Sequence, residues 1–183
     1  TMTNEMGVEV KEKLSKDAKT WSTAEDLGYN HTYSIVASDV DGNKKNLSFS
    51  TPQAAGVAEV SLTPIPDSEV GVGQVIGVNF GVPITDRKAA EKTITVTTNP
   101  EVKGAFYWVN NQEVRWRPKD YWEPGTKVEV KVDQYGQDLG GGIYGGENAK
   151  TNFTIGDRTV AIIDNATKTM KVFKNKKFLR AIP

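Results

Sequence analysis

Short runs of alternating apolar and polar residues fill most of the chain, and nearly every run ends at a turn signal. Alternation with a period of two is typical of a strand that buries one face. In the first 53 residues the runs lie at Val8–Lys11, Trp21, Thr32–Ser38 and Leu47–Thr51, with Asp41-Gly42-Asn43 as a hairpin turn before the last run. Four short strands are too few to close a sandwich. The pattern therefore predicts an incomplete β-domain over residues 1–53.

A second and longer series follows a linker at Thr51-Pro-Gln-Ala-Ala-Gly56, where proline and small residues show no periodicity. Asp86 is typical of an N-cap and predicts one short helix, Arg87–Lys92. The expected strands of this series are Val57–Leu62, Val75–Phe80, Thr93–Thr98, Gly104–Val109, Glu113–Arg117, Lys127–Val132 and Lys150–Ile155. Strands in this number and spacing predict a complete immunoglobulin-like sandwich over residues 54–156, without the usual disulfide.

The last 27 residues begin a new series with strands at Thr159–Asp164, Thr169–Lys174 and Lys177–Ile182. The tight turn Asn175-Lys176 joins the last two strands. We expect a meander whose lysines form one wet face and whose apolar face needs a partner. The predicted fold class is therefore all-β, with tandem immunoglobulin-like sandwiches, the first incomplete, followed over residues 157–183 by the first strands of a truncated β-rich domain.

The charge balance of 23 basic and 23 acidic residues hides a segregation. Residues 157–183 hold seven basic and two acidic residues, so this segment carries a net charge of +5 and the rest carries −5. A basic tail is compatible with a nucleic-acid or membrane contact. We favour the alternative that it is a piece of a larger domain. Nucleic-acid binding is not expected, because the lysines lack an aromatic platform for stacking bases.

The residue inventory excludes several kinds of chemistry. The chain has no cysteine and a single histidine, His31, so it has no thiolate nucleophile, no disulfide and no multi-histidine metal site. A carboxylate pair for acid–base catalysis needs burial or a close charged partner, and Asp120 and Glu123 lie in a turn with solvent-type neighbours, so we discount them. No catalytic residue, metal site or cofactor is expected. No apolar run of about 18 residues is present that would span a membrane.

Three features leave a binding role open. The glycine-rich stretch Gly136–Gly146 lacks the lysine and helix of a phosphate loop, so we expect a mobile loop between strands. Among the clustered aromatic residues, Trp108 and Trp116 are expected in the core, whereas Trp122, in a turn, is a weak candidate for stacking on a sugar. A mild excess of glycosylation sequons keeps a glycosylated surface protein as an alternative; they begin at Asn30, Asn46, Asn152 and Asn165.

The order of parts resembles a known family. The run from Trp21 to Tyr33 is similar to the late strands of the first Ig-like domain of actinobacterial L,D-transpeptidases. The run from Trp116 to Val128, with the loop ending Gly142-Ile-Tyr-Gly145, resembles the second such domain. Phe153-Thr-Ile-Gly-Asp-Arg158 resembles the passage into the catalytic domain. The resemblance covers nearly the whole chain.

The resemblance implies a non-catalytic spacer from an exported enzyme that forms 3→3 peptidoglycan cross-links. In that family a cysteine thiolate, assisted by a histidine, attacks a tetrapeptide stem. The family's catalytic histidine and its Ser-His-Gly-Cys motif lie downstream of the matched strands. The chain itself is therefore expected to be inactive. Its expected partners are peptidoglycan, through the parent enzyme, and its own catalytic domain, with any membrane contact made by an N-terminal anchor outside this chain. The alternative is a cell-surface Ig-like adhesin or glycan-binding module.

Overall fold

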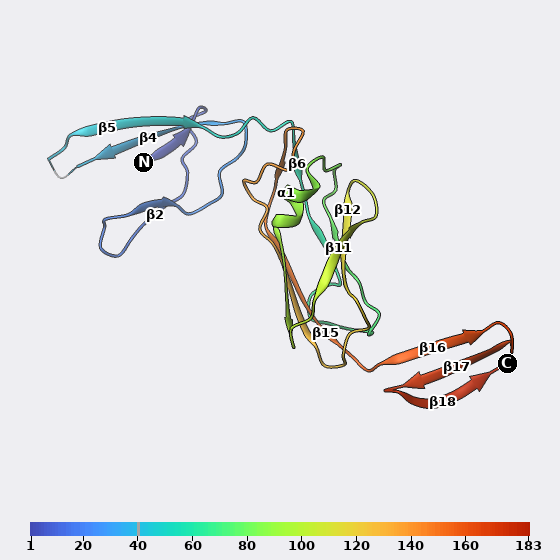
Figure 1. Cartoon of the computed structure of the whole chain (residues 1–183). Helices are drawn as coiled ribbons and strands as arrows, with labels where there is room; N and C mark the ends of the chain where they lie inside the picture. The colour runs from blue at the N-terminus through green and yellow to red at the C-terminus, as the bar shows by residue number, and fades with distance from the viewer. Residues whose placement is uncertain (40) are drawn as a thin grey trace. The chain divides into compact units, whose positions relative to one another are not determined.

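The computed structural model describes residues 1–39 and 41–183, and its regular secondary structure is almost entirely strand (Figure 1). It divides into two compact units, Thr1–Ala55 and Gly56–Pro183. The helix α1 (Arg87–Lys92) begins after Asp86, whose side chain accepts a hydrogen bond from the Ala89 amide. In the part of the chain that the structure describes, no helix is long and apolar enough to cross a bilayer. The predicted all-β fold class is confirmed.

The first unit contains two small antiparallel sheets. One has the strand order β1-β4-β5 and the other pairs β2 with β3. Their strands are β1 (Met2–Asn4), β2 (Glu12–Leu14), β3 (Trp21–Thr23), β4 (Thr32–Ser38) and β5 (Lys44–Ser50). The predicted hairpin of β4 and β5 is thus confirmed, whereas a regular strand at Val8–Lys11 is not formed. That segment folds back on β1, where the Val10 amide donates to the Met2 carbonyl oxygen.

The core of the first unit is small. Among its described hydrophobic residues only Met2 and Tyr33 are buried, and Tyr33 stacks on Phe49 with ring centroids 5.7 Å apart. Leu47 and Phe49 on β5 keep 51% and 41% of their surface exposed. A sheet that buries so little apolar area gains little hydrophobic stabilisation.

A carboxylate joins the segment after β1 to the start of β4. Glu5 accepts a hydrogen bond from the Thr32 amide at 2.9 Å and lies 2.6 Å from Nδ1 of His31. The hydrogen bond to His31, followed by backbone donors that include the Thr32 amide, lowers the pKa of Glu5 below its ordinary value. His31 therefore has a structural partner in this unit.

The second unit contains a sandwich of two four-stranded sheets, with the orders β10-β13-β15-β8 and β11-β12-β9-β7. Its elements are β6 (Gly56–Ala58), β7 (Ser61–Thr63), β8 (Ser68–Val70), β9 (Ile76–Asn79), β10 (Ile94–Asn99), β11 (Gly104–Trp108), β12 (Glu113–Pro118), β13 (Lys127–Val132), β14 (Ile143–Gly145) and β15 (Ala149–Ile155). The single strand predicted at Val57–Leu62 is two strands. β6 pairs in parallel with β14, whereas β7 pairs antiparallel with β9.

The interior of the sandwich is filled from both sheets. Trp116 on β12 lies 5.6 Å from Trp122, and Phe153 on β15 meets Trp122 edge-on at 6.5 Å, measured between ring centroids. The valines of β13 are buried and alternate with exposed charged residues, as the sequence pattern predicts. Trp122 is only 2% exposed, and its indole N–H donates to the Gln74 carbonyl oxygen at 2.7 Å. Its ring is therefore a central part of the core.

The chain ends in an antiparallel meander of β16 (Thr159–Asp164), β17 (Thr169–Lys174) and β18 (Lys177–Ile182). Asn175 and Lys176 both have positive φ, which matches the tight hairpin turn predicted there. Successive side chains of a strand point to opposite faces, so Lys171 and Lys174 lie on different faces of the meander. The prediction of a single lysine face is therefore wrong.

Replacing Trp122 with alanine tests its place in the core. We expect Trp122→Ala to lower the free energy of unfolding by about 3–5 kcal/mol, because it leaves a cavity and an unpaired Gln74 carbonyl. The adjacent Tyr121 is 54% exposed, so Tyr121→Ala is the matched control and should change stability by less than about 1 kcal/mol. Urea denaturation followed by tryptophan fluorescence measures both, and equal losses would contradict the assignment.

Acid should loosen the contact between Glu5 and β4. Since the folded pKa of Glu5 is lowered, its contribution is complete above the unfolded pKa and is lost as the pH falls through the folded value. Glu5→Gln should therefore flatten the pH dependence of first-unit stability below about pH 4. The chemical shift and exchange rate of the Thr32 amide report the change, with Glu9→Gln as the control. An unaltered Thr32 titration in Glu5→Gln would refute the contact.

Candidate functional site

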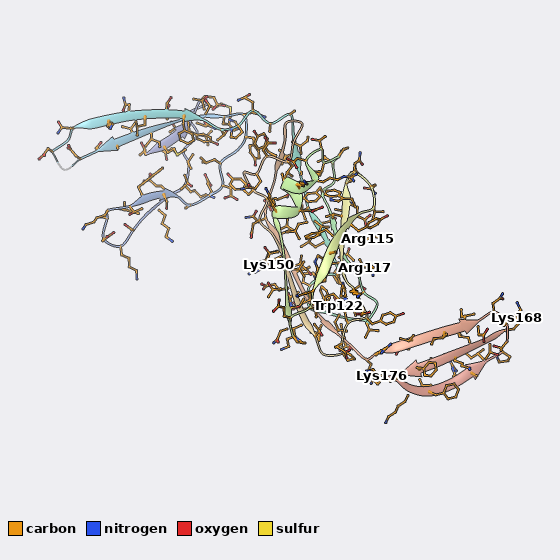
Figure 2. All side chains as sticks on the ribbon, viewed as in Figure 1. Arg115, Arg117, Trp122, Lys150, Lys168 and Lys176 are labelled. Atoms are coloured by element: carbon orange, nitrogen blue, oxygen red, sulfur yellow. The ribbon has the colours of Figure 1, made fainter. Side chains whose placement is uncertain are left out.

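The residues that the sequence analysis considered for binding or catalysis do not gather into one site. Trp122 lies inside the sandwich with no ring face open to a sugar (Figure 2). Asp120 and Glu123 line an open groove beside it together with Arg158. His31 belongs to the other unit and contacts Glu5. Among the described residues no group of three or more histidine, cysteine, aspartate or glutamate side chains is placed to hold a metal ion.

The glycine-rich stretch Gly136–Gly146 is folded into the sandwich, which contradicts the expectation of a mobile loop. It contains the strand β14, and Leu139 within it is fully buried. Gly140 has a positive φ, and a Cβ there would lie 2.5 Å from the Thr85 hydroxyl oxygen, so no larger residue fits. The stretch covers the sandwich interior and pairs with β6, the first strand after the linker.

The connector between the two units is hydrogen-bonded to the first unit as far as Ala54. Thr51 donates its amide to the His31 carbonyl oxygen at 2.9 Å. Asn30 donates its amide to the Pro52 carbonyl oxygen and its side-chain Nδ2 to the Ala54 carbonyl oxygen, at 3.1 Å each. Asn30 holds a φ of +63°, a conformation that asparagine tolerates better than most residues.

The second unit holds the other end of the connector. Gly56 begins β6 and pairs with Ile143 of β14, and the Gly146 amide donates to the Ala58 carbonyl oxygen at 2.9 Å. Only Ala55 separates the last residue that is hydrogen-bonded within the first unit from the first strand of the second. The part of the connector that is not bonded into either unit is therefore one residue long.

A second connector joins the sandwich to the meander and is also hydrogen-bonded at both ends. The Gly156 amide donates to the Val70 carbonyl oxygen at 2.8 Å, which fixes the end of β15 to β8. On the meander side, Asn175 donates its amide to the Arg158 carbonyl oxygen at 2.7 Å and accepts the Arg158 amide on its side-chain oxygen at 2.9 Å. The Arg158 guanidinium also lies over the ring of Tyr121, 5.3 Å from its centroid.

Asp157 adds charge to this second connector. It accepts a hydrogen bond from Asn175 at 2.9 Å and pairs with Lys174 at 2.8 Å. These two donors, Asn175 first, hold the pKa of Asp157 below its ordinary range, and the same pairing raises the pKa of Lys174. The carboxylate therefore stays ionised and bonded throughout the neutral pH range.

Asn30 and Asn175 are the residues that sequence reasoning missed. The sequence pattern predicts a tight turn at Asn175 and marks Asn30 only as part of a sequon, and it does not show that the two side chains reach the connectors. Both adopt positive φ, so an asparagine in a turn that precedes or follows a predicted strand is the signal that could have found them. The partners themselves are up to 24 positions away in the sequence and follow from the fold.

Comparison with known proteins agrees with this architecture. The profile of the family described as bacterial Ig domain matches residues 1–138. L,D-transpeptidase 2 of Mycobacterium tuberculosis (strain CDC 1551 / Oshkosh) is 44% identical over 186 residues, covering 100% of this chain and 46% of that protein. L,D-transpeptidase 5 of M. tuberculosis (strain ATCC 25618 / H37Rv) is 30% identical, covering 93% of this chain and 40% of that protein. The chain spans less than half the length of these two relatives.

Solved structures show the same likeness. An LD transpeptidase in complex with imipenem superposes with a TM-score of 0.58 at 31% identity, over 69% of this chain and 52% of that one. The L,D-transpeptidase from Mycobacterium smegmatis gives 0.53 at 25% identity over the same shares. The chain therefore belongs to the bacterial Ig domain family and is homologous to the Ig-like region of mycobacterial L,D-transpeptidases.

Proposed function

We propose that this chain is the non-catalytic spacer of an exported L,D-transpeptidase, an enzyme that forms 3→3 peptidoglycan cross-links in the cell envelope. The observation that carries the proposal is the 44% identity to an L,D-transpeptidase over the entire chain. The lack of cysteine in this sequence is consistent with a part that does not hold the nucleophile. Peptidoglycan would then be the partner of the parent enzyme.

The two connectors support a spacer role. Each is short, and each is hydrogen-bonded into the folded elements on both of its sides. A spacer of this kind fixes the distance between its two ends more closely than a flexible linker of the same length. The reason is that a flexible linker samples many end-to-end distances. We propose the boundaries 1–53, 54–156 and 157–183 for its parts, with β16–β18 as the opening strands of the catalytic domain. A lipid or other N-terminal anchor would complete this arrangement.

The adhesin or glycan-binding alternative has lost the ring that motivated it, since Trp122 is buried and hydrogen-bonded. The coding sequence downstream of Pro183 separates the two functions. The spacer proposal requires a histidine followed by a Ser-His-Gly-Cys motif there. A further Ig repeat in its place would favour the adhesin and overturn the proposal.

A flexible insertion tests the spacer role in the whole protein. About ten Gly/Ser residues inserted after Ala55 should leave turnover of soluble stem peptides unchanged, because the active site is not altered. Cross-linking of intact cell walls should fall by about tenfold, since a flexible tether lowers the effective concentration at the target. The same insertion between Asp41 and Gly42, in an exposed hairpin turn, is the control. Equal activity of both insertions on walls would count against a spacer.

Loosening the second connector is a milder test. Asp157→Asn removes the charge that pairs with Lys174, whereas Asn175→Ala removes the two hydrogen bonds of the Asn175 side chain and leaves its backbone bond. We expect faster exchange of the Arg158 amide in Asn175→Ala than in Asp157→Asn. Only Asn175→Ala removes the side-chain oxygen that accepts a hydrogen bond from this amide. Similar protection of Arg158 in both variants would show that Asn175 does not hold the connector.

A further inference from the structure

The strand β11 forms one end of its sheet. In the order β11-β12-β9-β7 it pairs with β12 alone, in a register that runs without a break from Gly104 to Trp108. Natural proteins usually block such edges with a bulge, a proline or a covering element. β11 contains neither a bulge nor a proline.

The hydrogen-bond pattern shows which backbone groups point outward. The Val109 amide donates to the Glu113 carbonyl oxygen at 3.0 Å, so residue 109 directs its polar groups towards β12. In an antiparallel pair the residues that do so alternate along the strand. Ala105 and Tyr107 therefore also face β12 with their backbone groups, whereas the N–H and C=O of Phe106 point to the free edge.

A groove of about 650 Å3 is lined by residues 103–107, which include most of β11, and by residues 117–119 at the end of β12. Its lining includes Tyr107, which is 67% exposed, and three basic side chains, those of Lys103, Arg117 and Lys119. The volume is in the range of ligand-binding clefts. The groove thus combines outward backbone groups, an exposed aromatic ring and positive charge.

Among the described residues no carboxylate lines this groove, although Arg117 and Lys119 also line the neighbouring groove that contains Asp120 and Glu123. In the described part of the chain, no ion pair joins Lys103, Arg117 or Lys119 to an acidic residue, whereas the neighbouring Arg115 is paired with Glu113 at 2.7 Å. Three unpaired cations around an aromatic ring are complementary to a ligand that carries carboxylates.

We propose that the β11 edge binds an extended peptide with acidic side chains, which adds to the sheet as a further strand. A peptide fits better than another polyanion because its backbone amides can pair with the outward N–H and C=O of Phe106. A peptide segment of about five residues, about 17 Å of extended chain, would match the length of β11. Acidic side chains at alternate positions would face Arg117 and Lys119 on the outer face. The inference goes beyond the spacer function and does not depend on it.

Binding of a labelled probe peptide tests the charge component. The probe is fluorescein-labelled (Glu-Thr)4 with blocked ends, measured by fluorescence anisotropy against the whole chain. Arg117→Glu/Lys119→Glu should weaken binding by about tenfold or more, and salt should weaken it for the native chain. The matched control, Lys127→Glu/Lys150→Glu, changes two exposed lysines of the other sheet, where Figure 2 marks Lys150, and should bind as the native chain does. Equal losses in both variants would overturn the site.

The backbone component has a separate readout. Addition of a strand should slow hydrogen exchange of the Phe106 amide and shift its proton resonance, while the Ala105 amide, already bonded to β12, should change little. (Lys-Thr)4 should not bind. Unchanged exchange at Phe106 with bound peptide would overturn strand addition. Competition by hyaluronan, a polyanionic glycan without a peptide backbone, at equal charge concentration would overturn it as well.

Discussion

The burial of one face of each sheet is the constraint on which the second unit depends. A sheet with one apolar face is stable only when another layer covers that face. The aromatic contact of Trp116, Trp122 and Phe153 joins the two sheets through rings supplied by β12, by the turn after it and by β15. Because Trp122 comes from a turn, the core extends to the end of the sandwich. The Trp122 amide also donates to the Val72 carbonyl oxygen at 3.0 Å, which ties that end to the segment following β8.

The connectors depend on that core for their order. β15, which carries Phe153, ends directly before Gly156, and β6, which follows the first connector, is held by the glycine-rich stretch that closes over the sandwich. The first unit has no comparable interior among its described residues, and its end of the connector is held by hydrogen bonds of Asn30 and by the Glu5 contact near it. The spacer proposal thus rests on a well-packed body on one side and on polar contacts on the other.

Strand positions with strong alternation were predictable from the sequence, and β4, β13 and the three strands of the meander occur where expected. Alternation of apolar and polar residues indicates a strand that buries one face in one sheet. The prediction from alternation was therefore wrong for segments that do not bury one face in this way. Val8–Lys11 alternates but remains largely exposed, and Val57–Leu62 alternates across a change of sheet after Ala58.

The remaining errors concern contacts between segments that are distant in the sequence. The glycine-rich stretch was misjudged because local composition does not show that Leu139 fills the interior of the sandwich. Trp122 was placed in a turn correctly, but only the packed fold shows that its ring turns inwards. The connector bonds of Asn30 and Asn175 could not be predicted either, because their partners are brought near only by the folding of other strands.

Backbone 15N relaxation of the whole chain measures whether the first connector belongs to the folded structure. We predict order parameters of about 0.85 for the amides of Thr51, Gln53 and Ala54, equal to those of the flanking strands β5 and β6. Order parameters below about 0.6 at these three amides, as for a flexible linker, would contradict it.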